Sequence, residues 1–191
     1  MNKKTLSTIT FISSLVILLF SILGLIILNL NYLTVSGEAY LPGFHYPQYI
    51  TINFSGYNLI FGNNSIQFVI EPLLHLIGFI LFFVGSLIFT IISIINYSTK
   101  DESKKIRIKC VSSNDKKKTY KAISIILSII LGLIAILFMV FGCLGLYGGT
   151  SGTTYHIGIA KILAGFLLGF NFLILAFALD VFLYYKSLMS A

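Results

Sequence analysis

The chain of 191 residues contains no Trp, only two Cys, only three Pro and only six acidic residues. Two cysteines cannot supply the disulfide framework of a small extracellular domain. Cys110 and Cys143 also fall on opposite sides of the membrane in the topology described below, so we expect no disulfide. Charged residues make up 10% of the chain and hydrophobic residues 57%. This composition excludes an ordinary soluble domain and is typical of an integral membrane protein.

Four apolar runs are each long enough to cross the hydrocarbon core of a bilayer, which takes about 20 helical residues. The first run follows Lys3 and Lys4. It is too long for the apolar part of a signal peptide, so we interpret it as a retained helix. The predicted fold is an all-α integral membrane bundle that forms a single domain over residues 1–191. Its four transmembrane helices cover roughly residues 10–30, 68–95, 122–147 and 157–184.

Basic residues are concentrated in the loop of residues 98–121, which holds nine Lys or Arg and three acidic residues. Because Lys and Arg are retained on the cytoplasmic side, this loop and both termini are expected in the cytoplasm. The membrane is expected to be the cell membrane. The loop either contacts anionic lipid headgroups or serves only to set the topology. Nucleic-acid binding is not expected, since the basic part of the loop lacks aromatic residues. The expected lipid contacts are Lys104, Lys105, Arg107, Lys109, Lys116, Lys117 and Lys118.

The connection of residues 31–66 contains no Lys or Arg and is predicted to lie outside. Residues 49–54 alternate between polar and apolar, as a strand does, and Ser55-Gly56 is compatible with a tight turn. We therefore predict a small extracytoplasmic β-hairpin over residues 49–61, in which Phe54 pairs with Tyr57, Ile52 with Leu59 and Ile50 with Phe61. Asn53 and Asn63 begin glycosylation acceptor patterns. The second outer connection, residues 148–156, is Gly-rich and is predicted to be a flexible, tight loop.

Each predicted helix carries small and polar residues on one side, which is how membrane helices approach one another closely. The four stripes predict one compact bundle with these sides inward. Cys143 is expected to be a small interior residue, whereas Asn171 projects off the stripe of its helix. Asp180, near the inner end, is expected to pair with Lys121 or Lys186. The glycines expected at helix contacts are Gly78, Gly85, Gly132, Gly142, Gly165 and Gly169.

Glu71, His75 and Lys161 are the candidate polar cluster. Glu71 and His75 are one helical turn apart, and Lys161 lies at a similar depth on the fourth helix. Ionisable residues at such positions are costly and usually paired. In one interpretation they line an outward-open pocket in which His75 titrates. In the other, Glu71 and Lys161 form a structural ion pair and His75 is hydrogen-bonded inside the bundle.

Cytoplasmic termini, a longer first outer loop with β character and a short second one resemble the plan of claudin-like and tetraspan proteins. The resemblance is one of topology, because the outer loops here contain no Trp and no cysteine. We find no enzyme motif, so we expect no catalytic residue, cofactor or metal. The predicted function is non-enzymatic and works through contacts, as an accessory subunit, scaffold or surface-interaction protein. Its partners would be other membrane subunits or further copies of the chain. The alternative is a small channel or transporter with Glu71, His75 and Lys161 in an outer vestibule.

Overall fold

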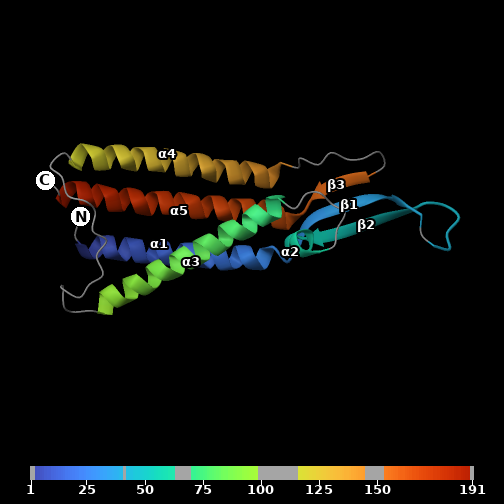
Figure 1. Ribbon diagram of the computed structural model, residues 1–191, viewed down its shortest axis with the longest axis horizontal. Helices are drawn as coiled ribbons and strands as arrows, with labels where there is room; N and C mark the ends of the chain where they lie inside the picture. Colours follow the sequence, from blue (N-terminus) through green and yellow to red (C-terminus); the bar gives the residue numbers. More distant parts are fainter. Residues whose placement is uncertain (1–2, 41, 63–69, 99–115, 145–152, 190–191) are drawn as a thin grey trace.

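Four long helices, one short helix and a small sheet make up the computed structural model, which describes residues 3–40, 42–62, 70–98, 116–144 and 153–189 (Figure 1). The long helices run side by side, and the sheet extends from one end of them. In chain order the elements are α1 (Lys3–Ile27), β1 (Asn31–Ala39), β2 (Gln48–Ser55), α2 (Gly56–Phe61), α3 (Ile70–Ser98), α4 (Lys116–Cys143), β3 (Thr153–Ile157) and α5 (Ile159–Met189).

The four long helices each contain a span apolar and long enough to cross a membrane: Thr5–Ile27, Ile70–Asn96, Thr119–Cys143 and Ile159–Leu183. These spans confirm the expected number of such helices, with ends that differ from the predicted ones by a few residues. Between 11% and 33% of the residues in each span's most apolar window are buried inside the protein. Most of their Leu, Ile and Phe side chains therefore face outward, where only an apolar surrounding would accept them without cost.

The helices form a row rather than the closed bundle that four inward stripes predicted. α4 lies along α5, α5 lies along α1, and α3 crosses α1 at an angle (Figure 1). α3 also contacts α5 partway along the two helices, where the rings of Phe82 and Phe172 meet edge to face with centroids 4.8 Å apart. A T-shaped aromatic pair of this kind adds to the stability of the contact. The two helix pairs are thus joined mainly by α1 against α5, with the Phe82–Phe172 contact added between α3 and α5.

The sheet has the strand order β2-β1-β3, with both neighbours antiparallel to β1. Val35 in the central strand lies between Ile52 of β2 and Tyr155 of β3. Because alternate residues of a strand share a face, this row belongs to an apolar face, and the opposite face is polar. Thr34, Ser36, Thr51, Asn53, Thr154 and His156 lie on that polar face.

The predicted hairpin is wrong in its second half. β2 matches the alternating residues 49–54, but residues 56–61 form helix α2, and β2 pairs with β1 instead. Ser55 acts as a helix N-cap here, because its hydroxyl accepts a hydrogen bond from the backbone N–H of Asn58 at 3.1 Å. The pairs proposed for Phe54, Ile52 and Ile50 with residues 57–61 therefore do not form. The chain reverses instead between β1 and β2, where Gly43 has a φ of 91° that favours glycine.

The connection of residues 148–156 also contains structure that the sequence did not predict. Residues 153–157 form β3, which pairs with β1 from Leu33 to Gly37. Residues 148–152 of the predicted flexible loop lie outside the described residues. β3 leads into α5 at Gly158, whose Cα lies against the backbone of Asn31 so closely that a side chain there would collide with it. The sheet therefore packs directly against the start of α5.

The buried apolar core lies where the sheet meets the helices. It combines Leu28, Tyr32, Leu33, Leu59, Phe79, Ala160, Ala164 and Leu168. Phe79 of α3 fills the space over Gly24 of α1, so the absence of a side chain at position 24 admits the ring. α2 closes one side, since its Tyr57 hydroxyl donates to the carbonyl of Leu25 at 3.1 Å. The sheet and the helices are consequently one packed unit at this junction.

Candidate functional site

Glu71 and Lys161 form an ion pair, with 2.7 Å between Oε2 of Glu71 and Nζ of Lys161. Both residues belong to the first turns of their helices, α3 and α5, which begin at the same end of the row (Figure 1). Lys161 is completely buried, whereas the Glu71 side chain is 29% exposed. A cation in the first turn of a helix is opposed by the helix dipole, so the nearby carboxylate offsets an unfavourable position.

Lys161 also joins a third helix to the pair. Its Nζ donates to the backbone carbonyl of Leu144, just after α4 ends, at 2.9 Å. That carbonyl is one of the groups at a helix end that have no partner within the helix. The ammonium of Lys161 thus connects the ends of α3, α4 and α5 in one place.

His75 lies one turn further along α3 and is 2% exposed. Its Nδ1 lies 2.8 Å from the hydroxyl oxygen of Tyr32, which is 1% exposed. The imidazole also packs against the Phe138 ring of α4, with centroids 5.9 Å apart. Nε2 of His75 is buried and makes no hydrogen bond within the described part of the chain. The imidazole is thus enclosed by aromatic groups from the sheet and from α4.

Tyr32 is the residue of this cluster that sequence reasoning missed. The β1–β2 register shifts between Asn31 and Leu33, so Tyr32 is the extra residue of a bulge. A bulge re-aims a side chain, and here it accompanies the turn of Tyr32 toward α3. The backbone carbonyl of Tyr32 accepts a hydrogen bond from Gly158 N–H at 2.9 Å. The signal that would have found Tyr32 is a strand at residues 31–39, which was not predicted.

A second set of buried polar residues lies between the long helices. Asn171 of α5 is completely buried and its Nδ2 donates to the Ser21 hydroxyl of α1 at 3.4 Å. Its Oδ1 has no hydrogen-bond partner within the described residues. Thr90 of α3 donates to the Ser14 hydroxyl of α1 at 3.1 Å. Asn171 does lie off the stripe of small residues, which contacts α4 through Gly165 and Gly169, and it is nevertheless buried because α5 also packs against α1.

Asp180, near the other end of α5, accepts a hydrogen bond from the Ser124 hydroxyl of α4. The predicted partners were Lys121 and Lys186. Lys121 is exposed, and the side chain of Lys186 lies outside the described residues. Cys143, the last residue of α4, is exposed rather than interior. Cys110 lies outside the described residues.

The six glycines expected at helix contacts divide into two groups. A Cβ at Gly165 would lie 2.6 Å from the carbonyl oxygen of Phe138 and 2.8 Å from Cα of Gly142, so α4 and α5 touch there through their backbones. Gly78 lies against Leu168, and Gly169 against Ala135 and Met139. Gly85 and Gly132 have nothing within 4 Å of the position of a Cβ. These two therefore do not lie at a close helix contact.

The remaining predicted residues lie apart from the buried cluster. Asn53 is exposed on β2, and Asn63 lies outside the described residues. Lys104, Lys105, Arg107 and Lys109 also lie outside them, whereas Lys116, Lys117 and Lys118 form the start of α4. Within the described ranges, no three His, Cys, Asp or Glu residues come together in a way that would hold a metal ion.

The contacts of this cluster connect helices to one another and to the sheet. The Glu71–Lys161 ion pair joins α3 to α5, and the two hydrogen bonds of Tyr32 connect the sheet to α3 and to Gly158 at the start of α5. Comparison with known proteins adds no relative to this description: no protein-family model, no curated protein and no solved structure matches the chain.

Proposed function

We propose that this chain is a non-enzymatic multi-pass protein of the cell membrane that works by contacting other proteins. In this proposal the four long helices cross the membrane, both termini are cytoplasmic and the sheet lies outside. The two termini, the end of α3 and the start of α4 lie together at the end opposite the sheet (Figure 1). The segment of residues 98–121, which carries nine basic residues, includes the last residue of α3 and the start of α4, and this agrees with retention of Lys and Arg in the cytoplasm.

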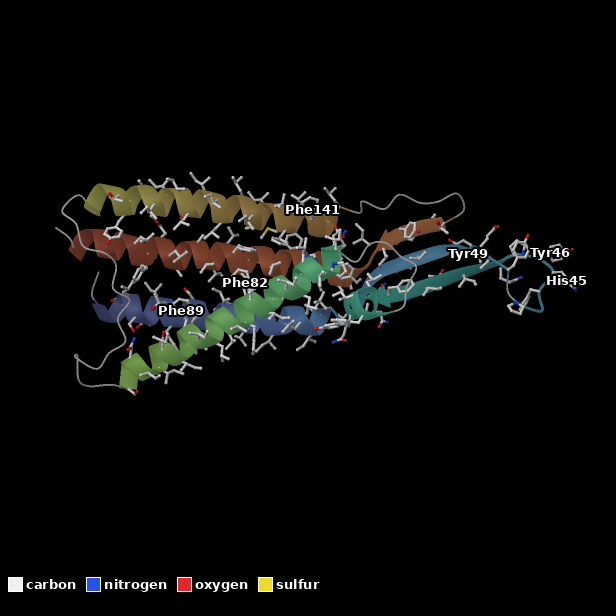
Figure 2. The ribbon with its side chains drawn as sticks, in the orientation of Figure 1. His45, Tyr46, Tyr49, Phe82, Phe89 and Phe141 are labelled. Atoms are coloured by element: carbon white, nitrogen blue, oxygen red, sulfur yellow. The ribbon has the colours of Figure 1, made fainter. Side chains whose placement is uncertain are left out.

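The observation that carries the proposal is an aromatic tip at the far end of the sheet, formed by Tyr40, Phe44, Tyr46 and Tyr49. Their exposed fractions are 77%, 57%, 77% and 69%. Figure 2 shows Tyr46 beyond the end of the strands, far from the helices. Residues 39–55 include no Asp, Glu, Lys or Arg. Tyrosine-rich surfaces that lack charge are typical of the centre of protein–protein interfaces.

The aromatic tip is held at a defined distance and angle from the helices. β1 has nine residues, so the tip stands about 30 Å from the ends of the helices. The base of β1 is fastened by Tyr32 to His75 and by Gly158 to the first turn of α5. A contact surface that is ordered before binding loses less conformational entropy when its partner arrives. The fixed position of the aromatic tip therefore supports a role of the sheet in recognising a protein partner.

The same cluster bears on the channel alternative. A vestibule would need its charged groups to be open to water, but Lys161 is completely buried and paired with Glu71. Tyr32 covers His75 from the sheet side. This geometry favours the structural ion pair over the outward-open pocket, and the contact function over transport.

Site-specific photo-crosslinking in cells tests the proposal with the full chain. A photoreactive phenylalanine analogue at position 46 should give a discrete adduct with another protein or with a second copy of the chain. The same analogue at Phe89, which is 52% exposed on α3, is the matched control and should react with lipid. Replacing Tyr40 and Tyr46 by Ser should also reduce the native mass of the detergent-extracted complex. A strictly monomeric parent chain, or equal adducts at both positions, would sink the proposal.

A further inference from the structure

A polar groove lies at the base of the sheet, on the side away from the aromatic tip. Its volume is about 420 Å³. We call it the asparagine groove. It lies at the junction of three segments: the residues after α1, the end of β2 and the start of α2. Its polar lining consists of Asn29, Asn31, Asn53, Ser55 and Asn58.

The lining of the asparagine groove carries no charged side chain. Its other two residues are Leu30 and Phe54. Without Lys or Arg, the groove has no group that would compensate a phosphate, and without Asp or Glu it has none for a cation. Amide side chains each offer two donor hydrogens and one acceptor oxygen. This combination fits a neutral ligand that both donates and accepts hydrogen bonds.

Two amides of the groove, those of Asn31 and Asn53, are held in place by hydrogen bonds to each other and to Thr34. Asn53 Oδ1 accepts from the Thr34 hydroxyl at 2.8 Å and from Asn31 Nδ2 at 3.4 Å. Asn31 Nδ2 also donates to the Thr34 hydroxyl at 2.9 Å. With Oδ1 of Asn53 engaged toward β1, its Nδ2 group is directed away from Thr34. A fixed donor of this kind favours specific recognition, because little rotamer freedom remains to be lost on binding.

Polar residues continue from the asparagine groove along the sheet. On the same face, the hydroxyls of Ser36 and Thr51 lie 3.1 Å apart across β1 and β2. The groove itself begins at Asn29, two residues after the span Thr5–Ile27 ends. If α1 crosses the membrane, the groove therefore lies about 3 Å beyond the hydrocarbon, at the level of lipid headgroups.

From these observations we infer that the asparagine groove binds a neutral, hydroxyl-rich group, namely a sugar. The amides would hydrogen-bond the sugar hydroxyls, and Leu30, which is 49% exposed, would pack against the C–H surface of the ring. The sugar is either the headgroup of a glycolipid or a free glycan, and the two sources share this chemistry. Sugar binding in the asparagine groove is independent of the aromatic tip and of the partner of that tip.

Native mass spectrometry of the full chain released from nanodiscs tests the inference. One set of nanodiscs contains phosphatidylcholine with a monohexosyl diacylglycerol, and the other contains phosphatidylcholine with phosphatidylglycerol. We expect bound hexosyl lipid and no comparable retention of phosphatidylglycerol. Asn29→Ala and Asn58→Ala should each weaken this binding about two- to tenfold, the effect of one lost neutral hydrogen bond. Asn96→Ala, at the other end of α3, is the matched control and should bind as the parent does.

Saturation-transfer NMR with methyl glucoside distinguishes the two sources of sugar. A signal that Asn58→Ala weakens would assign the groove to free glycans as well, whereas hexosyl-lipid binding without such a signal would assign it to the lipid headgroup. Circular dichroism of each variant shows whether it is folded. Equal retention of both lipids, or binding that neither groove variant weakens, would overturn the inference. A glycan found attached to Asn53 itself would also overturn it, because that glycan would occupy the groove.

Discussion

His75 of α3 and Tyr32 of β1 are both buried, and their side chains meet at 2.8 Å between Nδ1 and the hydroxyl oxygen. This contact crosses from the sheet to the helices and joins residues far apart in the chain. It requires a helical turn that begins at Glu71 and a bulge in β1 at Tyr32. The first turn of α3 and the bulge in β1 therefore both help to hold the sheet against the ends of the helices.

Tyr32→Phe should lower the free energy of unfolding by about 1–3 kcal/mol, because it leaves a buried imidazole without this hydrogen bond. Thermal unfolding in detergent, followed by circular dichroism, measures the effect. Tyr46→Phe removes the same hydroxyl from the exposed aromatic tip and should change nothing. Combining Tyr32→Phe with His75→Leu should recover much of the loss, since both partners are then apolar. Equal effects of the two Tyr→Phe changes would contradict this account of the junction.

The Glu71–Lys161 pair should respond asymmetrically to the loss of either partner. Glu71→Gln leaves a fully buried ammonium without its carboxylate and should cost about 3–5 kcal/mol. Lys161→Met leaves a carboxylate that is 29% exposed and that water can reach, so it should cost less. Denaturation of the purified variants in detergent compares the two. The double variant should be more stable than Glu71→Gln alone. A larger loss for Lys161→Met would show that Glu71 is the more enclosed charge.

Transport tests the alternative function directly. We expect proteoliposomes of the parent chain to show no proton or ion flux above protein-free liposomes at any pH in the neutral range, since Lys161 and His75 are enclosed. A pH-sensitive dye inside the vesicles reports proton movement. Glu71→Gln and His75→Ala should leave this background unchanged. Flux in the parent that either variant alters would support the vestibule and remove the purely structural interpretation of the cluster.

Gly165→Ala should separate α4 from α5, because the new methyl group would lie 2.6 Å from the carbonyl oxygen of Phe138. The backbones would have to move, and we expect a destabilisation of about 1–3 kcal/mol, typical of overpacking. Gly85→Ala is the matched control in α3, where a methyl group meets nothing within 4 Å. It should be neutral or should stabilise the helix by up to about 1 kcal/mol. Thermal unfolding of both variants tests this, and equal losses would contradict the close contact of α4 and α5.

The helices could be predicted from the sequence because each apolar run has the length that a helix needs to cross a bilayer. The pairing of Glu71 with Lys161 could be predicted in the same way, because both residues lie near the start of helices that begin at the same end of the row. The sheet could not be predicted in this way. β1 shows weak alternation and pairs with β3, which is far along the chain. Ser55-Gly56 is compatible with a hairpin turn and with a helix cap, and local sequence does not choose between them. Tyr32 was missed for the same reason, because its position depends on the register of β1.

Asn171 offers a test of whether α5 crosses the membrane. It lies midway along the span Ile159–Leu183 and is completely buried against Ser21 of α1. Asn171→Asp would place a carboxylate at the bilayer centre and should cost about 3 kcal/mol on insertion scales. Asn96→Asp makes the same change at the last residue of the α3 span, where water is near, and should cost much less. Expression and insertion of the two variants in a membrane-integration assay compare them. Equal insertion would place residue 171 away from the bilayer centre, whereas selective failure of Asn171→Asp would show that α5 spans the membrane.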